Sequence, residues 1–246
     1  MASIAGLLTV DCGNSTVDCF HHDDGARLRF DSHLGSADVI SDWLAERRVS
    51  RCVVASVVAA VGERVIAVLR RSDLRVERVG VDLPCPLRLA YSAPDKLGVD
   101  RWLAAFAAHR RYGKALVADC GSATTINLVD ASGAFLGGCI GPGLRALVVG
   151  MSATTPALPA PCLEAMPTLP AVDTQQAIDA GVLLGYGGLV ERLVSDSLRV
   201  FGPARVVLTG GNSTIVRRTS RLQADIENDL VHRGMHLLAL DVACVR

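Results

Sequence analysis

The chain has 246 residues, half of them hydrophobic and 4% aromatic, so we expect a large core built mainly from aliphatic side chains. Its 25 basic and 25 acidic residues give no net charge and form no long run of one sign, which argues against nucleic acid or an anionic membrane as partner. No apolar run reaches the roughly 18 residues of a membrane span and no basic leader is visible, so we expect a cytoplasmic protein.

The first part of the chain alternates between strand and helix patterns, which is typical of an α/β layered fold. Apolar or alternating segments predict strands over 6–10, 16–20, 27–30, 51–58 and 74–79. Helical spacing of apolar residues predicts helices over 37–48, 62–71 and 98–113, the last of them after a proline-rich connector at 82–94.

The strand pattern restarts after residue 113. Strands are predicted over 115–119, 124–130 and 134–140, and again at the start of 205–212. A helix is expected to begin within 141–144 with Pro142 near its first position, and 152–173 reads as a proline-rich loop or lid. One long helix is predicted from Thr174 to about Phe201, and its glycines suggest close packing against another helix or subunit.

Nearly the same turn opens both halves, as DCGNST at 11–16 and as DCGSATT at 119–125. In each, an apolar strand ends on Asp, Gly follows two residues later, and hydroxyl-bearing residues come next. Such a turn lets backbone N–H groups approach phosphate oxygens, while the carboxylate would bind a cation that bridges to phosphate. A third glycine turn, TGG at 209–211, offers a flat surface for adenosine. We interpret the repeat as a structural duplication that holds a nucleotide triphosphate and its metal.

This pattern resembles the actin, hexokinase and Hsp70 ATPase superfamily. The resemblance implies an α/β fold of two similar ribonuclease-H-like domains, each a mixed β-sheet flanked by helices, with an ATP cleft between them. We place these domains at residues 1–113 and 114–246. The motifs that follow one another along the chain are similar, as an ordered set, to those of type III pantothenate kinases: DCGNST, GVDR (98–101), DCGSATT, LGGCIGPGL (136–144), DTQQAI (173–178) and TGG.

That family transfers the γ-phosphate of ATP to the 4′-hydroxyl of pantothenate, the first step towards coenzyme A. The resemblance implies that Asp100 is the general base and that Asp119 holds a monovalent cation, K⁺ or NH₄⁺, beside ATP and its Mg²⁺. Implied ATP-binding residues are Asp11, Gly13, Asn14, Ser15, Thr16, Asp18, Ser122, Gly210 and Gly211. Implied pantothenate-binding residues are Tyr91, Gly98, Val99, Asp100, Arg101 and Thr174, with Arg101 on the substrate carboxylate.

Two positions depart from the family pattern. Ser122 stands where Thr is usual and keeps the hydroxyl, whereas Asn127 stands where Asp is usual and removes a negative charge near the proposed cation. The second departure leaves open a non-catalytic nucleotide-binding homologue that acts as a regulatory accessory factor. Arg101 would hold any small anion, so a kinase for another carboxylic acid also stays open. A homodimer is expected, because glycines would let the helix predicted from Thr174 to about Phe201 pack closely against a second subunit. The family resemblance also implies a substrate site near the dimer interface.

Overall fold

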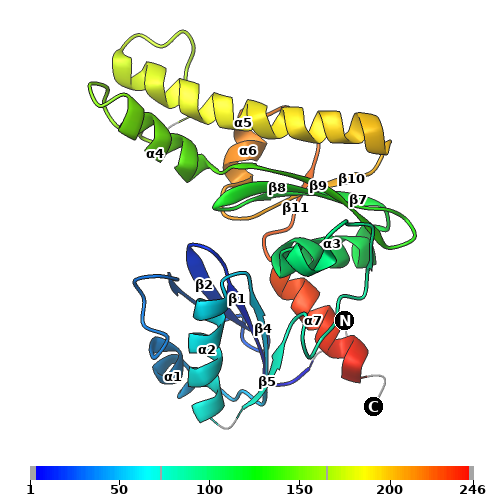
Figure 1. Ribbon diagram of the computed structural model, residues 1–246. Helices are drawn as coiled ribbons and strands as arrows, with labels where there is room; N and C mark the ends of the chain where they lie inside the picture. The colour runs from blue at the N-terminus through cyan, green and yellow to red at the C-terminus, as the bar shows by residue number, and fades with distance from the viewer. Residues whose placement is uncertain (1–3, 73, 165, 244–246) are drawn as a thin grey trace. The chain divides into compact units, whose positions relative to one another are not determined.

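The computed structural model describes residues 4–72, 74–164 and 166–243, and the chain forms two compact units (Figure 1). The first unit combines residues 1–110 with 230–246, and the second contains residues 111–229. The sequence places the division after residue 113 and leaves the C-terminal segment in the second domain. Helix α7 (Leu230–Ala243) instead belongs to the first unit, because it packs on that unit's strands β1 (Leu7–Cys12) and β4 (Arg51–Ser56).

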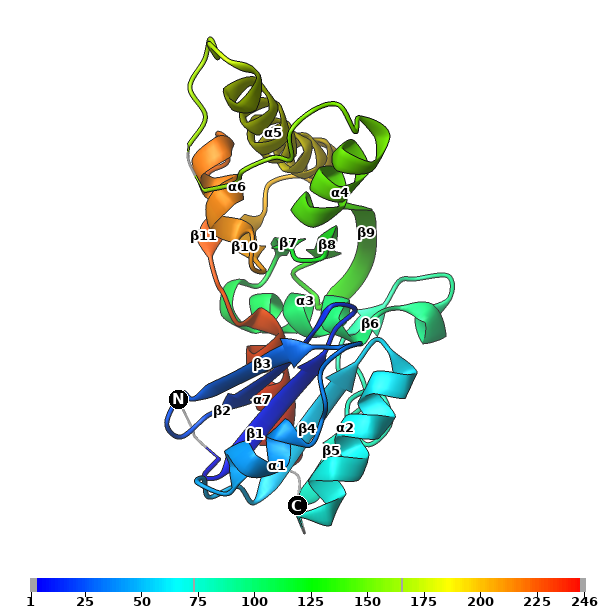
Figure 2. The ribbon, with the colours of Figure 1, turned by 90° about the vertical axis from the view of Figure 1, so that its left-hand side faces the viewer.

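The first unit is built on a mixed sheet. Its strands lie in the order β3 (Arg27–Asp31), β2 (Thr16–His21), β1, β4 and β5 (Arg75–Arg78). The first three pair antiparallel, whereas β1, β4 and β5 pair parallel. Helices α1 (Val39–Leu44) and α2 (Ala59–Arg71) lie on one face of this sheet (Figure 2). Alternate residues of the strands contribute to the core that they share with these helices.

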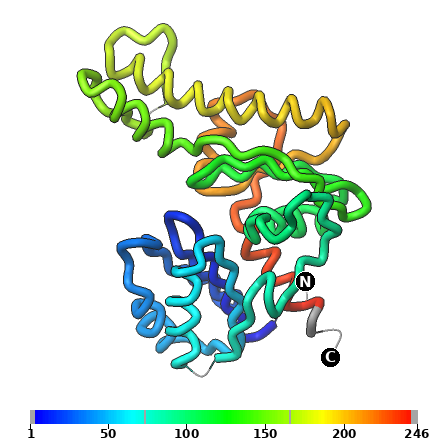
Figure 3. Tube along the Cα trace, viewed as in Figure 1, coloured from blue at the N-terminus to red at the C-terminus, as the bar shows by residue number. Residues whose placement is uncertain are grey.

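Helix α7 closes the other face of the same sheet. Figure 3 follows the chain from the blue first strands to this red last helix, two segments far apart in sequence that pack together. The approach is close at Gly234, where an added Cβ would lie 2.5 Å from the carbonyl oxygen of Leu103 in helix α3 (Val99–Tyr112). Glycine is therefore the residue that lets α7 reach its position.

The second unit repeats this topology. Its strands β9 (Ala134–Pro142), β8 (Ala123–Val129) and β7 (Ala115–Cys120) pair antiparallel, and β10 (Arg205–Thr209) and β11 (Asp225–Ile226) continue the sheet in parallel from β7. Each unit thus has a three-stranded meander followed by two parallel strands. The predicted duplication is confirmed, as are the two mixed sheets flanked by helices.

Helices α4 (Leu144–Thr154), α5 (Thr174–Phe201) and α6 (Ser213–Thr219) complete the second unit, where α5 packs on both other helices. The predicted bounds of α5 are confirmed. Of its glycines, Gly187 packs closely on α6, since an added Cβ would lie 2.5 Å from the carbonyl oxygen of Thr219. Helix α4 begins at Leu144, within the expected range 141–144, but Pro142 is the last residue of β9 and lies two residues before the helix.

The segment between the first sheet and α3 is largely irregular, as its prolines predict. It contains the short strand β6 (Arg88–Leu89) and a 3₁₀ turn at Pro94–Lys96. Helix α3 follows within the predicted range 98–113, and its residues 101–108 are all buried. This segment and the start of α3 carry most of the predicted pantothenate-binding residues.

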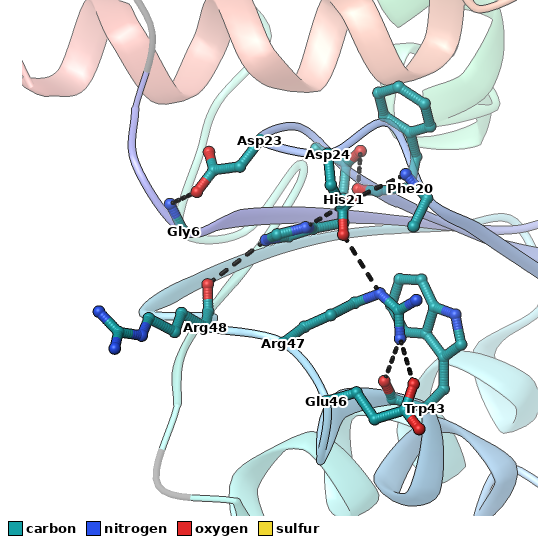
Figure 4. Close-up of polar contacts among 11 residues, drawn as sticks. Gly6, Phe20, His21, Asp23, Asp24, Trp43, Glu46, Arg47 and Arg48 are labelled. Atoms are coloured by element: carbon teal, nitrogen blue, oxygen red, sulfur yellow. Dashed lines mark hydrogen bonds and ion pairs between the residues drawn. The ribbon is translucent and has the colours of Figure 1, made fainter.

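A polar cluster fixes the turn that joins β2 to β3 (Figure 4). The buried imidazole of His21 contacts Asp24 through Nδ1 at 2.8 Å and the carbonyl oxygen of Arg48 through Nε2 at 3.3 Å. Arg47 lies 3.5 Å from the same Asp24 carboxylate and stacks over the ring of Trp43 at 4.2 Å. These contacts tie the outer end of the β2–β3 hairpin to the segment after α1.

Candidate active site

The first predicted phosphate turn, between β1 and β2, has its carbonyl groups engaged by the protein. Gly13 N donates to the Thr16 carbonyl at 3.0 Å, and Ser32 Oγ donates to the Gly13 carbonyl at 2.8 Å. Ser32 N donates to the Ser15 carbonyl at 3.1 Å, and the His33 ring contacts the Asn14 carbonyl at 2.8 Å. Because these oxygens are used internally, the turn can offer a ligand mainly N–H groups and hydroxyls, which suits an anion.

Two aspartates lie side by side below this turn. Asp11 on β1 and Asp18 on β2 are direct partners in the antiparallel pair. Asp18 accepts from Nε of Arg27 and from Nε of Arg29, each at 2.9 Å. Burial raises the pKa of the Asp18 carboxyl, but contacts with His232 and the two arginines outweigh burial and hold that pKa below its usual value. Asp18 therefore keeps its negative charge and stabilises the third strand.

The predicted general base lies at the start of α3. Asp100 Oδ1 accepts from the N–H of Arg101 at 2.7 Å, and it folds so closely over Gly98 that an added Cβ there would lie 2.5 Å from the same oxygen. Burial raises the pKa of Asp100, which the Arg101 charge and backbone N–H groups only partly offset. The Arg101 side chain is itself buried, with its guanidinium 6.0 Å from the ring centre of Tyr91. The structure thus brings together four predicted residues of the first unit.

The second predicted phosphate turn, between β7 and β8, receives two other segments of its own unit. Gly210 follows β10 with φ of +82°, and a Cβ there would lie 2.3 Å from Asp119 Oδ1. Asn212 donates to the Cys120 carbonyl through its N–H at 2.9 Å and its side-chain amide at 3.1 Å. A Cβ on Gly143 would lie 2.3 Å from the Ser122 carbonyl oxygen. Asp119, Ser122 and Gly210 therefore meet at one turn of the second unit.

Comparison with known proteins gives this arrangement a family. The family model for type III pantothenate kinase matches residues 7–196, which is most of the chain. The chain belongs to the type III pantothenate kinase family. A type III pantothenate kinase from Rhizorhabdus wittichii is 31% identical over 252 residues, covering 94% of this chain and 96% of its own. The reaction is therefore the ATP-dependent phosphorylation of pantothenate in coenzyme A biosynthesis.

Solved structures agree on the fold. A Campylobacter jejuni protein, named as a candidate Baf family transcriptional activator, has a TM-score of 0.61 at 20% identity and covers 96% of this chain and 99% of its own. A ROK family glucokinase from Streptomyces griseus, solved with glucose and AMPPNP, has a TM-score of 0.55 at 12% identity and covers 95% of this chain and 99% of its own. Both likenesses concern the fold alone. They match the expected type III pantothenate kinase architecture of two mixed sheets flanked by helices.

Thr174, which is predicted to bind pantothenate, is the first residue of α5 in the second unit. The helix is capped by the preceding residue, since Asp173 accepts from the N–H of Gln176 at 2.8 Å. Thr174 is therefore not needed as the cap. It lines a cavity of about 670 Å³ whose other walls are mostly apolar. The residues around that cavity are Pro142, Leu147, Met151, Leu158, Thr174, Ala177, Ile178, Gly181, Val182, Gly185 and Leu189.

Asn127, which departs from the type III pantothenate kinase pattern, is fully buried on β8. Its side-chain amide donates to Thr125 Oγ1 at 3.0 Å, and Thr125 is the direct strand partner of Asp119. Residues 125 and 127 share one face of the sheet, because side chains alternate along a strand. The charge difference from the family thus falls close to the residue proposed to hold a cation.

Sequence reasoning missed several residues that shape these turns. Ser32 and His33 follow β3, and nothing in their sequence context indicates that they hold the first turn. Asn212 and Gly143 have a signal, because Gly143 lies within the motif LGGCIGPGL and Asn212 directly follows the TGG turn. Among the described residues, none of the helices combines the length and the apolar character that a membrane crossing requires.

Proposed function

We propose that Asp100 is the general base that accepts the proton of the pantothenate 4′-hydroxyl as the phosphoryl group leaves ATP. The observation that carries this assignment is the Asp100 carboxylate at the start of α3, with its pKa raised by burial and the buried Arg101 beside it. A base with a raised pKa accepts a proton more readily near neutral pH. Arg101 is suited to the substrate carboxylate, since a guanidinium can form two parallel hydrogen bonds with it. Tyr91, Gly98 and Val99 lie on the same segment and would complete this contact, and Thr174 is proposed as a further one.

The residues proposed for ATP follow the two turns. Asn14, Ser15 and Thr16 would donate to phosphate oxygens from a turn whose carbonyl groups are already engaged. Ser122 would donate from the second turn, and Gly210 and Gly211 would leave room for the nucleotide. Gly13 supports this role, because a Cβ there would lie 3.2 Å from the Thr16 carbonyl and disturb the turn.

Two aspartates fit the proposed cations. Asp11 is the residue before the end of β1, next to the first turn, and offers the carboxylate oxygens that Mg²⁺ prefers. Asp119 lies against Gly210, where the missing side chain lets the carboxylate come close to the turn backbone. We propose that this carboxylate supplies oxygen ligands to the monovalent cation. When bound, Mg²⁺ supplies charge stabilisation to the phosphates that are separated in the transfer.

We expect the Asn127→Asp variant to bind potassium more tightly than the wild type does. A carboxylate beside Thr125 would add a negative charge close to Asp119, so the potassium concentration for half-maximal activity should fall about threefold or more. In potassium-free buffer the same variant should melt at a lower temperature, because a buried carboxylate without a cation is costly. Asn127→Ala, which removes the amide without adding charge, is the control. An unchanged potassium response in the Asp variant would contradict the proposed cation position.

We also propose that the chain forms a homodimer through the exposed side of α5. Gly181, Gly185 and Gly188 recur on this helix, and apart from the adjacent backbone of the helix itself no atom of the described residues lies within 4 Å of where their Cβ atoms would be. The neighbouring cavity is lined by apolar side chains. Sedimentation equilibrium should therefore give twice the mass of one chain, and Gly185→Glu should give a single chain. A wild-type protein that sediments as one chain would contradict this interface.

The activity itself is tested by following ADP release from purified protein with ATP, Mg²⁺ and potassium. Release that requires pantothenate supports the proposal. Release that requires a different carboxylic acid would reassign the substrate, and slow hydrolysis that ignores every acid would point to a nucleotide-binding regulator. A cytoplasmic location stays a prediction.

A further inference from the structure

Helix α7 places two histidines on the sheet face that carries the β1–β2 aspartates. Thr9 and Asp11 are two residues apart on β1, so their side chains point to the same face of the sheet. Asp18 lies directly opposite Asp11 on β2, so its side chain shares this face. His232 from α7 is buried against this face. Its Nδ1 lies 2.8 Å from Thr9 Oγ1, and its Nε2 lies 3.6 Å from Asp18 Oδ2.

The contacts continue beyond Thr9 as a chain. Thr9 Oγ1 lies 3.0 Å from His22 Nε2, and His22 Nδ1 lies 3.2 Å from His236 Nδ1. Burial, and then the neighbouring histidines, lowers the pKa of His22 to about 3, so this ring is neutral at physiological pH. The Thr9 hydroxyl also approaches the Phe20 carbonyl at 3.4 Å, which is long for a hydroxyl hydrogen bond.

One arrangement of hydrogens is consistent with all of these contacts. A carboxylate only accepts, so we assign the hydrogen of His232 to Nε2, which faces Asp18, and leave Nδ1 to accept from the Thr9 hydroxyl. Thr9 then accepts from His22 Nε2–H, and His22 Nδ1 accepts from His236. At 3.6 Å the His232–Asp18 contact is a polar contact rather than a full hydrogen bond. Nε2 has no hydrogen-bond partner within the described residues, so Asp18 is the group toward which its N–H is directed.

The contact matters because Asp18 lies directly across from Asp11. Like charges in directly opposed strand positions repel each other, so the Asp18 charge must be held and compensated if Asp11 is to face a cation. Arg27 and Arg29 do this from the edge strand, where their side chains are 26% and 56% exposed. His232 is the partner from α7, with its side chain 5% exposed, and solvent screens its contact least.

We propose that His232 is a positioning residue for Mg·ATP, which holds Asp18 in place and so fixes the Asp11–Asp18 pair beneath the phosphate turn. The inference rests on the proposed function of that turn. It makes nucleotide affinity depend on the last helix of the chain, through a side chain that lies outside the residues 7–196 matched by the family model.

The test compares three variants of the full chain. His232→Gln can keep a donor near the Nε2 position, His232→Asn can keep only an acceptor near Nδ1, and His232→Ala keeps neither. We expect His232→Ala and His232→Asn to weaken Mg·ATP binding, measured by titration calorimetry, about three- to tenfold, and His232→Gln to stay within about twofold of wild type. The KM for ATP should rise in parallel, while the KM for pantothenate stays unchanged.

A matched control separates positioning from loss of stability. Leu238 is buried on the same helix and takes no part in the hydrogen-bond chain, so Leu238→Ala should lower the melting temperature without changing Mg·ATP affinity. Equal losses of affinity in Leu238→Ala and His232→Ala would overturn the proposal, as would a Gln variant no better than the Asn variant. Calorimetry needs no turnover, so a wild type that binds Mg·ATP without phosphorylating pantothenate would refute the proposed catalytic role and leave this test intact.

Discussion

Asp100→Asn should reduce kcat with pantothenate by about 10²- to 10⁴-fold, the range expected for losing a general base. The amide keeps the size of the side chain and can still accept from the Arg101 N–H, which now lies 2.7 Å from the carboxylate. ATP affinity, measured by calorimetry, should therefore stay within about twofold of wild type. Turnover at the wild-type rate in this variant would eliminate Asp100 as the base.

The same variant should not lose stability. Because the pKa of Asp100 is higher in the folded chain than in the unfolded chain, its ionised form opposes folding. That cost is present above the folded pKa and disappears as the pH falls through it. At neutral pH the Asn variant should therefore melt at or above the wild-type temperature, which separates a catalytic loss from an unfolding one.

The raised pKa also predicts the acidic side of the pH profile. The base works only when ionised, so kcat/KM for pantothenate should fall as the pH decreases through the pKa that Asp100 has in the substrate-free enzyme. The inflection should lie above the ordinary aspartate value of about 3.9. A profile that stays flat below that value would contradict the assignment.

Gly210→Ala should produce a large structural effect at the second turn. The residue has φ of +82°, and a Cβ would lie 2.3 Å from Asp119 Oδ1 and 2.7 Å from the Cys120 carbonyl carbon. Both strain and overlap oppose the side chain, so the free energy of unfolding should fall by about 1–3 kcal/mol. Because Asp119 must move, ATP affinity should fall about tenfold or more. Chemical denaturation and calorimetry measure the two effects.

Gly211→Ala provides the matched control, since among the described residues no atom beyond its two chain neighbours lies within 4 Å of its added Cβ. Its stability should change by about 0.5 kcal/mol or less. If Gly211 also lies against the nucleotide, the control keeps its stability but loses ATP affinity. Equal destabilisation by the two substitutions would mean that small movements relieve the crowding at Gly210, so that this crowding does not lower the free energy of unfolding.

Much of the fold follows from local pattern. The apolar alternation around 6–20 and 115–130 predicts the two hairpins, and the helical spacing after Thr174 gives both ends of α5, because Asp173 is a strong N-cap and Gly202 ends the helix. Pro142 is expected near the first position of α4 but ends β9 instead, since proline suits the end of a strand as well as a helix start. Local pattern contains no such guide to the packing of α7, which depends on contacts more than a hundred residues away.

The candidate site was predicted to a similar degree. Asp100, Arg101 and Tyr91 meet as expected because they are close in sequence, and Asp119 meets Gly210 because the duplicated topology sets β10 beside β7. Ser32, His33 and His232 could not be found this way, since their roles arise only when distant segments fold together.

The return of α7 to the first unit has a consequence for synthesis on the ribosome. Domains generally fold in the order in which they are made, with the N-terminal one first. Here the N-terminal sheet keeps the Thr9 face uncovered until residues 230–243 have been translated, whereas the later-made unit contains every one of its strands by residue 226. The unit that begins first is thus the one completed last, and a nascent chain stalled anywhere before its final helix would display an unfinished surface to chaperones and proteases.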